Sequence, residues 1–360
     1  MRRAVAGLCL LAVACSQPRD RGPDLATTWL LAQQGEDGSF RSPRHDRLQA
    51  GHSTTALAMT ALMHAPRAPH RAGAAAIARA LDFLGEHGVV PTADDATVDY
   101  PTYTAACWLW TVARLHPGDH EATAERLTAF LRTRQLNEDA GWEEADLAYG
   151  GFDFGAVIGM KPRGGDDANL STTAWVIQAC RAAGMPSDDP LLRRARTFVL
   201  RCQVEAPDDS RRHGGFVHSP VPSLTQSKAG FTDDGDARPM PYASATCDGL
   251  VALAALDERG TAAASAAAAW LVAHARVPDL ALPDVADLTL ALRVYTLSAL
   301  ARASPLLPAD PARDEAIAAV WRERQQADGR VVGWSGLMLE DDPLIATCLA
   351  LRGWPQAKEK

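Results

Sequence analysis

Aspartates stand at several points of this 360-residue sequence where a carboxyl group could do chemistry. A carboxylic acid with a raised pKa can act as a general acid, and two carboxylates several ångströms apart across a cleft can cleave a glycosidic bond. The candidate catalytic residues are Asp166, Asp167, Asp284 and Asp287. A carbohydrate-cleaving pair could also come from a partly different set, namely Asp153, Asp166, Asp284 and Asp341.

A second group of polar and aromatic residues lies at the starts of predicted helices or in the loops that lead to them. Helix N-termini carry unsatisfied N–H groups and partial positive charge, so they suit polar ligands. The same residue types are also common N-caps worth about 1 kcal/mol each, aromatic residues can pack a loop, and a histidine can be half-buried and satisfied. The cavity candidates are His52, Tyr100, Tyr103, Trp142, Asp153, Phe154, Asn169, Tyr242, Asp341 and Asp342.

The helices that position these residues are written as one unit repeated six times. Each unit is an apolar helix, a loop and a second, Ala-rich helix, and the whole domain covers 24–355. Two loops, 141–167 and 204–242, are unusually long, as functional loops often are. The predicted units are 24–65, 72–117, 119–184, 189–257, 260–303 and 311–354, with 285–303 read as one continuous inner helix.

The second helix of each unit is apolar nearly all round, as in Thr104-Ala105-Ala106-Cys107-Trp108-Leu109-Trp110. A helix without a wet face is buried, so the second helices should form an inner ring and the first helices an outer ring. We therefore predict an all-α fold, a closed α/α toroid. An open superhelix of stacked helix pairs is the alternative.

A glutamine followed by glycine and an aromatic residue recurs along the chain. The instances are Gln34 with Gly38-Ser39-Phe40, Gln135 with Gly141-Trp142, Gln203 with Gly214-Gly215-Phe216, and Gln326 with Gly329 and Gly333-Trp334. Over roughly residues 25–354 this pattern resembles the repeats of squalene cyclases and protein prenyltransferase β subunits. The resemblance implies an α/α toroid in which the glutamines cap helix ends and tie repeats together. It implies no particular chemistry, because a fold does not carry a function.

The chemistry of those families can be checked residue by residue. Class II terpenoid cyclases use a DxDD motif whose middle Asp donates a proton; Asp284-Val285-Ala286-Asp287 resembles it but has Ala286 at that position. Prenyltransferases hold zinc with Asp, Cys and His, and Cys247-Asp248 is the nearest approach, without the spacing. No CxxC pair occurs among the seven cysteines. We therefore expect neither a metal nor another cofactor.

The first residues resemble a bacterial lipoprotein signal. Arg2-Arg3 precede the apolar run 4–14, which is too short to span a bilayer. Cys15 follows Ala12-Val13-Ala14, so we expect 1–14 to be a signal peptide, Cys15 to carry lipid, and 15–23 to be a tether. Several acyl chains on one cysteine give stable anchoring. The predicted location is the bacterial periplasm or cell surface, held to a membrane.

These observations favour a lipoprotein that holds an apolar or extended ligand, isoprenoid, lipid-like or glycan, without the usual cyclase acid or zinc site. Its enzymatic status stays open, and an atypical class II terpenoid cyclase or a carboxylate-pair carbohydrate enzyme is the alternative. A net charge of -8 with no basic stripe argues against a nucleic-acid partner.

Overall fold

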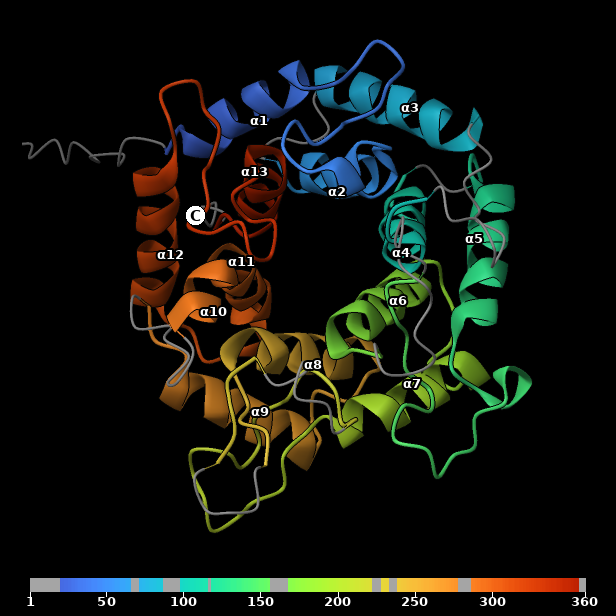
Figure 1. Ribbon diagram of the computed structural model, residues 1–360, viewed down its shortest axis with the longest axis vertical. Coiled ribbons are helices and arrows are strands. Elements are labelled where there is room, and N and C mark those ends of the chain that lie inside the picture. Colours follow the sequence, from blue (N-terminus) through green and yellow to red (C-terminus); the bar gives the residue numbers. More distant parts are fainter. Residues whose placement is uncertain are drawn as a thin grey trace, which may run out of the picture.

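The helices of the chain form two concentric rings around a common axis (Figure 1). A computed structural model describes residues 20–65, 71–86, 98–115, 118–155, 168–221, 228–232, 238–277 and 286–355, with the backbone alone at Arg71, Ala286 and Asp287. The outer helices are α1 (Gly22–Ala32), α3 (Arg71–Glu86), α5 (Glu121–Arg134), α7 (Pro190–Arg201), α9 (Ala262–His274) and α12 (Pro311–Arg324). The inner helices are α2 (His52–His64), α4 (Pro101–Val112), α6 (Leu170–Ala182), α8 (Ala243–Ala255), α11 (Arg293–Ala303) and α13 (Pro343–Arg352), with the short α10 (Ala286–Ala291) leading into α11.

The inner ring is closed. Each inner helix packs against the next, and α13 packs against α2, so the last repeat meets the first. The outer ring closes at the same seam, where the side-chain amide of Gln325 donates to the carbonyl of Gly22 at 2.8 Å. The predicted α/α toroid is therefore confirmed, and the open superhelix is excluded.

The inner helices supply most of the core. In α2, the eleven residues from His52 to Leu62 are all buried, and in α4 only Tyr103 is not. Outer helices bury one stripe each; in α7 this stripe is Leu191, Leu192, Ala195, Phe198 and Val199. Ala and Thr at many inner positions permit close approach of neighbouring helices, while helix propensity is kept by the alanines.

Within the described residues, one joint recurs four times where successive repeats meet. A glutamine at the end of an outer helix donates its Nε2 group both to a loop glycine carbonyl and to a carbonyl of the next outer helix. Each glycine has a φ between +82° and +99°, which glycine adopts without strain. The residue two positions later donates its backbone N–H to a threonine of the inner helix. The sets are Gln34, Gly38 and Thr55; Gln135, Gly150 and Thr173; Gln203, Gly214 and Thr246; and Gln325, Gly329 and Thr347.

Two of the four predicted joints were wrong in detail. In the third repeat the glycine is Gly150 with Phe152, in place of Gly141-Trp142, because the loop between the glutamine and the glycine is longer there. In the sixth repeat the glutamine is Gln325, one residue before the predicted Gln326, and Val331 takes the aromatic position. Fixed spacing and an aromatic residue are therefore poorer guides to this joint than the glycine itself.

The sequence predicts one continuous inner helix over 285–303 in the fifth repeat, but the helix is interrupted. It breaks at Leu292, between α10 and α11. The N–H groups of Val294 and Tyr295 donate to the carboxylate of Glu340, at 2.7 and 2.8 Å. A side chain that takes two amides away from the preceding turn starts a new helix there.

Among the described residues no helix combines the length and apolar character needed to cross a membrane. Within the same ranges no three His, Cys, Asp or Glu residues gather as a metal site. The five cysteines there are buried and free of disulfides, and burial raises their pKa, for example to about 12 at Cys107. They contribute as small apolar side chains.

Candidate functional site

All six inner helices begin at one end of the toroid, and at four of them the loop of the next repeat binds the first turn. Asp99, from the second repeat, accepts from the backbone N–H groups of His52 and Ser53 at the start of α2. The carbonyl of Phe154 accepts from α4 and that of His218 from α6. Each cap comes from the loop of the next repeat, as does Glu340 for α11. The mouth of the toroid is thereby a surface shared between repeats.

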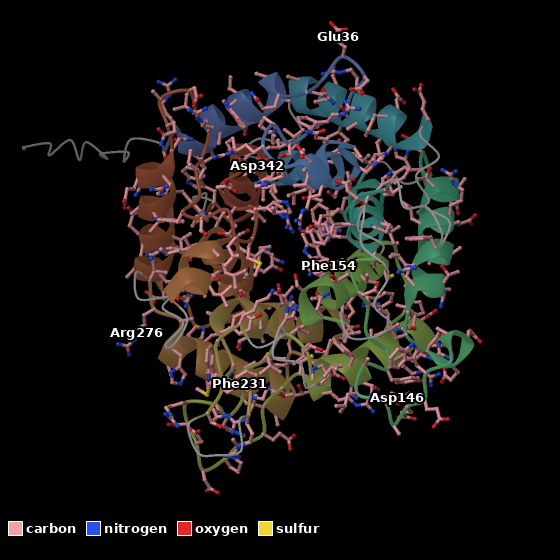
Figure 2. All side chains as sticks on the ribbon, in the orientation of Figure 1. Glu36, Asp146, Phe154, Phe231, Arg276 and Asp342 are labelled. Atoms are coloured by element: carbon pink, nitrogen blue, oxygen red, sulfur yellow. The ribbon has the colours of Figure 1, made fainter. Side chains whose placement is uncertain are left out.

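A cavity of about 310 Å³ opens at this mouth. Four of the residues expected to line a cavity do so: Tyr100, Tyr103, Phe154 and Tyr242. Phe154 lies near the inner ends of α4 and α6, toward the centre of the ring, and its ring meets Tyr100 edge-on at 5.6 Å (Figure 2). The apolar walls are completed by Leu48, Leu57, Leu170, Leu292, Met338 and Leu349. The cavity is thus largely aromatic and aliphatic.

The polar groups of the cavity were not among the predicted site residues. Asp248 and Tyr295 face it from inner helices α8 and α11, and Lys228 and Glu340 face it from loops. The Tyr295 hydroxyl donates to Asp248 Oδ2 at 2.8 Å and lies 2.7 Å from the hydroxyl of Ser171. Ser171, Tyr295 and Asp248 therefore form one hydrogen-bonded chain across three inner helices.

Arg302 contacts this hydrogen-bonded chain at Asp248. Its Nη2 donates to Asp248 Oδ1 at 3.2 Å, and its side chain is 9% exposed. Burial raises the pKa of Asp248, whereas Arg302 and the Tyr295 hydroxyl lower it. Because both partners of this ion pair are buried, removal of either one would leave an unpaired buried charge, which is strongly destabilising.

The pKa values of Lys228 and Glu340 are shifted in opposite directions. Burial lowers the pKa of Lys228 to about 8, against the pull of Asp248 and Glu340. Burial raises the pKa of Glu340 to about 8, although two backbone N–H groups favour its ionised form. Clusters of groups with shifted pKa values in one cavity are typical of functional sites. His218, also on the wall, has its pKa lowered well below the usual range by burial.

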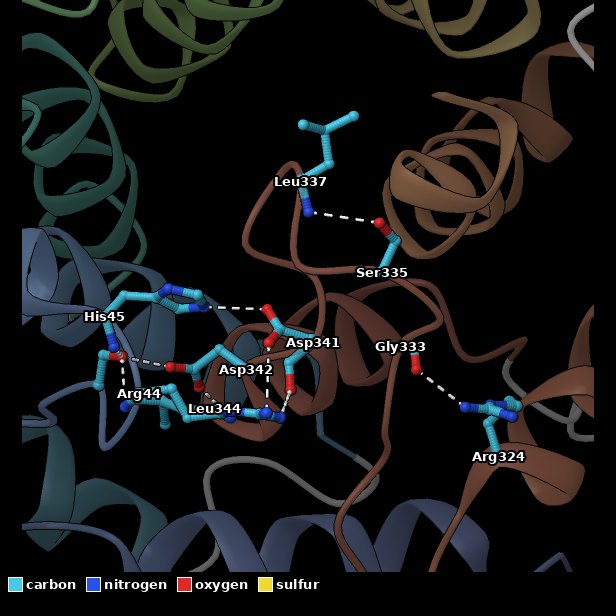
Figure 3. A network of polar contacts seen from close by, with 10 residues as sticks. Arg44, His45, Arg324, Gly333, Ser335, Leu337, Asp341, Asp342 and Leu344 are labelled. Carbon is cyan, nitrogen blue, oxygen red and sulfur yellow. Dashed lines mark hydrogen bonds and ion pairs between the residues drawn. The ribbon is translucent and has the colours of Figure 1, made fainter. Parts of the chain in front are cut away.

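Six other predicted cavity residues lie elsewhere at the mouth and do not line the cavity. Asp341 accepts from His45 at 2.9 Å and pairs with Arg44 at 3.5 Å, while Asp342 caps α13 through Leu344 (Figure 3). The Ser42 hydroxyl also donates to Asp342, which ties the first loop to the last inner helix. Polar contacts of this kind hold five of the six, which are His52, Asp153, Asn169, Asp341 and Asp342, whereas Trp142 packs against the hydrophobic core.

Asp166, Asp167 and Asp284, predicted as catalytic, lie outside the described residues, as does Cys15. Asp287 lies in α10, and its side chain is not described.

One signal in the sequence could have found the polar chain. Asp248 is the only charged residue of Ala243–Ala255, a helix that is otherwise apolar and small. A charge in the middle of a buried helix needs a partner or a function. Lys228 gives no such signal, because it sits in a polar loop and only the fold brings it to the cavity.

The fold and its cavity define the class as an α/α toroid. No protein-family description matches this sequence, and no curated protein matches it either. Among solved structures, the α-1,6-mannanase GH76A of Salegentibacter sp. HEL1_6 covers 92% of this chain and 98% of its own, with a TM-score of 0.59 and 11% identity. A protein from Actinoplanes has a TM-score of 0.48 and 17% identity over 92% of this chain and 97% of its own. The type II terpene cyclase MstE from Scytonema has a TM-score of 0.35 and 13% identity over 92% and 96%. The mannanase supports the fold alone.

Proposed function

We propose that this protein binds a small, largely apolar molecule in the cavity at the mouth of the toroid. The observation that carries the proposal is the cavity itself, about 310 Å³ and walled by tyrosines, Phe154 and leucines. Ligand sites are concave, mainly apolar and furnished with a few converging polar groups. Here Lys228, Asp248 and Glu340 are those groups, so the ligand has an apolar body and at least one polar function.

Binding is favoured over acid catalysis by how the two carboxyl groups are held. Asp248 is engaged by Tyr295 and Arg302, and both oxygens of Glu340 accept backbone N–H groups. These contacts already engage both oxygens of each carboxyl group, and a general acid needs its proton within reach of the ligand. The carboxyls are therefore tied to the framework of the cavity.

A second candidate is an acid-catalysed enzyme, favoured by the raised pKa of Glu340. With a pKa of about 8 the group carries a proton at neutral pH and borders the cavity. Such an acid could protonate an alkene or a glycosidic oxygen. Squalene, oxidosqualene and α-1,6-mannotriose are suitable trial substrates, the last because a mannanase shares the fold. A product that forms with the wild type and is lost in Glu340→Gln would support the enzyme in place of the binding protein.

The test of binding is native mass spectrometry on protein extracted from its own membrane, looking for a retained small molecule. Ala245→Phe places a ring in the cavity wall, whereas Ala269→Phe places the same ring on the exposed side of α9. We expect a ligand with the wild type and with Ala269→Phe, and none with Ala245→Phe, with all three equally helical by circular dichroism. Absence of any ligand from the wild type, and of uptake from a lipid extract, would count against the proposal.

We also propose that the chain is exported and lipid-anchored through Cys15. The support is the sequence before it: two arginines, a short apolar run and small residues ahead of the cysteine. Cys15→Ser should move the protein from the detergent phase to the aqueous phase in a phase-separation assay. Unchanged membrane association of that variant would rule the anchor out.

A further inference from the structure

Arg352 carries a buried charge that forms no ion pair within the described residues. It is the last residue of α13 and is 5% exposed. Within the described residues its guanidinium makes no hydrogen bond or ion pair, and its Nε and Nη1 atoms are enclosed. Burial, and secondarily the neighbouring Arg302, lower the pKa of Arg352 to about 10, so it is charged at neutral pH. Burial of an isolated charge is strongly unfavourable, so its retention calls for an explanation.

The Arg352 side chain reaches across the centre of the toroid. Its guanidinium carbon lies 3.8 Å from the ring centroid of Trp175, which belongs to α6. In the inner ring α13 packs against α2 and α11, whereas α6 packs against α4 and α8. The two helices therefore face each other across the axis (Figure 1), and the contact is made in the interior between them.

Arg302 places a second guanidinium group near the ring of Trp175. Its guanidinium carbon is 5.9 Å from the Trp175 centroid, and its Nε and Nη1 atoms are enclosed and unpartnered within the described residues. Asp248 is the carboxylate it contacts. Asp248 pairs with Arg302 and interacts with Arg352 only at longer range, so two positive charges beside the Trp175 ring face one carboxylate.

This basic pair adjoins the cavity. Tyr103 lines the cavity and meets Trp175 edge-on at 5.2 Å, and Asp248 lines the cavity and binds Arg302. Tyr295, a third wall residue, is hydrogen-bonded to Asp248. Arg302 therefore contacts a wall residue directly, and Arg352 packs on Trp175, which itself contacts the wall residue Tyr103.

We propose that Arg352 and Arg302 bind the anionic group, carboxylate or phosphate, of an amphiphilic ligand whose apolar part occupies the cavity. This inference rests on the proposed function and names the class of ligand. A guanidinium presents a rigid fork of donors that matches carboxylate and phosphate oxygens, and Arg is the usual residue where such groups are bound away from water. The face of Trp175 holds the guanidinium in place from behind.

Stacking on Trp175 alone does not account for the arrangement. A cation–π contact, even when desolvated, stabilises less than the burial of an unpaired charge costs. An apolar side chain of similar length would pack against the ring at lower cost, as replacements of buried charges in other proteins show. Removal of the Arg352 charge should therefore stabilise the ligand-free protein while it weakens anion binding, which a purely structural arginine would not do.

The test compares ligands with one tail and different heads. Decanol, decanoate and decyl phosphate are titrated by calorimetry into the full chain carrying Cys15→Ser, and thermal unfolding is followed without ligand. Arg352→Met removes the charge and keeps the aliphatic stem. Arg41→Met is the matched control, because Arg41 also lies over an aromatic ring, that of Phe83, but is paired with Asp37 at 2.7 Å.

We expect at least one anionic ligand to bind at least ten-fold more tightly than decanol, and the preferred head group to tell carboxylate from phosphate. Arg352→Met should bring that ratio close to one and leave the ligand-free melting temperature unchanged or higher; Arg41→Met should preserve the ratio. Binding of decanol and both anions with equal affinity would overturn the inference and leave the proposed function standing. Binding of none of the three would count against both. An unchanged ratio, or a marked loss of ligand-free stability, in Arg352→Met would also overturn the inference.

Discussion

Closure of the toroid rests in part on one side-chain amide, and adjacent glutamines allow a controlled test of it. Gln325 Nε2 donates to the carbonyl of Gly22 at 2.8 Å and to that of Gly329 at 2.9 Å. Both glycines are buried, so Gln325→Ala leaves two buried carbonyls without this donor. At roughly 1–1.5 kcal/mol for each hydrogen bond, the loss is about 2–3 kcal/mol. Gln326→Ala is the control, since Gln326 is exposed and, within the described residues, its side-chain amide donates only to the Arg324 carbonyl, at 3.4 Å.

The assay is urea unfolding of both variants followed by circular dichroism. We expect Gln325→Ala to lower the midpoint at an unchanged m-value, and Gln326→Ala to change the free energy of unfolding by less than about 0.5 kcal/mol. Equal effects of the two substitutions would refute the assignment of the seam to Gln325. A biphasic transition in Gln325→Ala would show that the end repeats open on their own.

Three further outcomes follow from the structure. Gly150→Ala should destabilise by at least about 2 kcal/mol more than Gly184→Ala, because their φ values are +82° and +83° but only at Gly150 would a Cβ meet a carbonyl, that of Arg194 at 2.0 Å; matched chemical-denaturation curves check this. His64 has its pKa lowered to about 4 by burial and nearby arginines, so the unfolded chain binds more protons between pH 6.5 and 4, and stability should fall by up to about 3 kcal/mol as pH drops through that window, less steeply in His64→Gln. Deletion of Asp310 to the end should abolish cooperative unfolding, since a closed ring has no dispensable end; a deletion variant with most of its helicity and a sharp melt would contradict this.

The fold could be predicted because its determinants are local and periodic. Ala-rich helices without a charged face must be buried, and their repetition at similar spacing leads to a ring. The inter-repeat joint was predicted as to residue type and missed in detail where loop length varies, as at Gly150, or where Val331 stands for an aromatic residue. The sequence pattern therefore predicted the toroid correctly but assigned wrong residues to two of the four joints between repeats.

The site was harder to predict, because helix starts carry two kinds of polar residue. Asp342 and Asn169 precede helices and cap them, whereas Tyr100 and Tyr242 precede helices and face the cavity. Position relative to a helix start does not separate these cases; the direction of the side chain does, and that depends on the packed neighbours. Arg352 could not be predicted as a site residue for a related reason. A basic residue in the last turn of a helix usually complements the helix dipole at the surface.

The same contacts that close the ring also make the cavity. The start of α2 is capped by Asp99 from the second repeat, and that of α11 by Glu340 from the sixth, which itself borders the cavity. The helix starts of α2, α4, α6 and α11 each donate a hydrogen bond to the loop of the next repeat. Ser42 of the first repeat binds Asp342 of the sixth, so the last wall helix is set in place only when the chain ends meet. The cavity is therefore a property of the closed ring, and a ligand that holds Glu340 and Lys228 in place stabilises contacts between repeats far apart in the sequence.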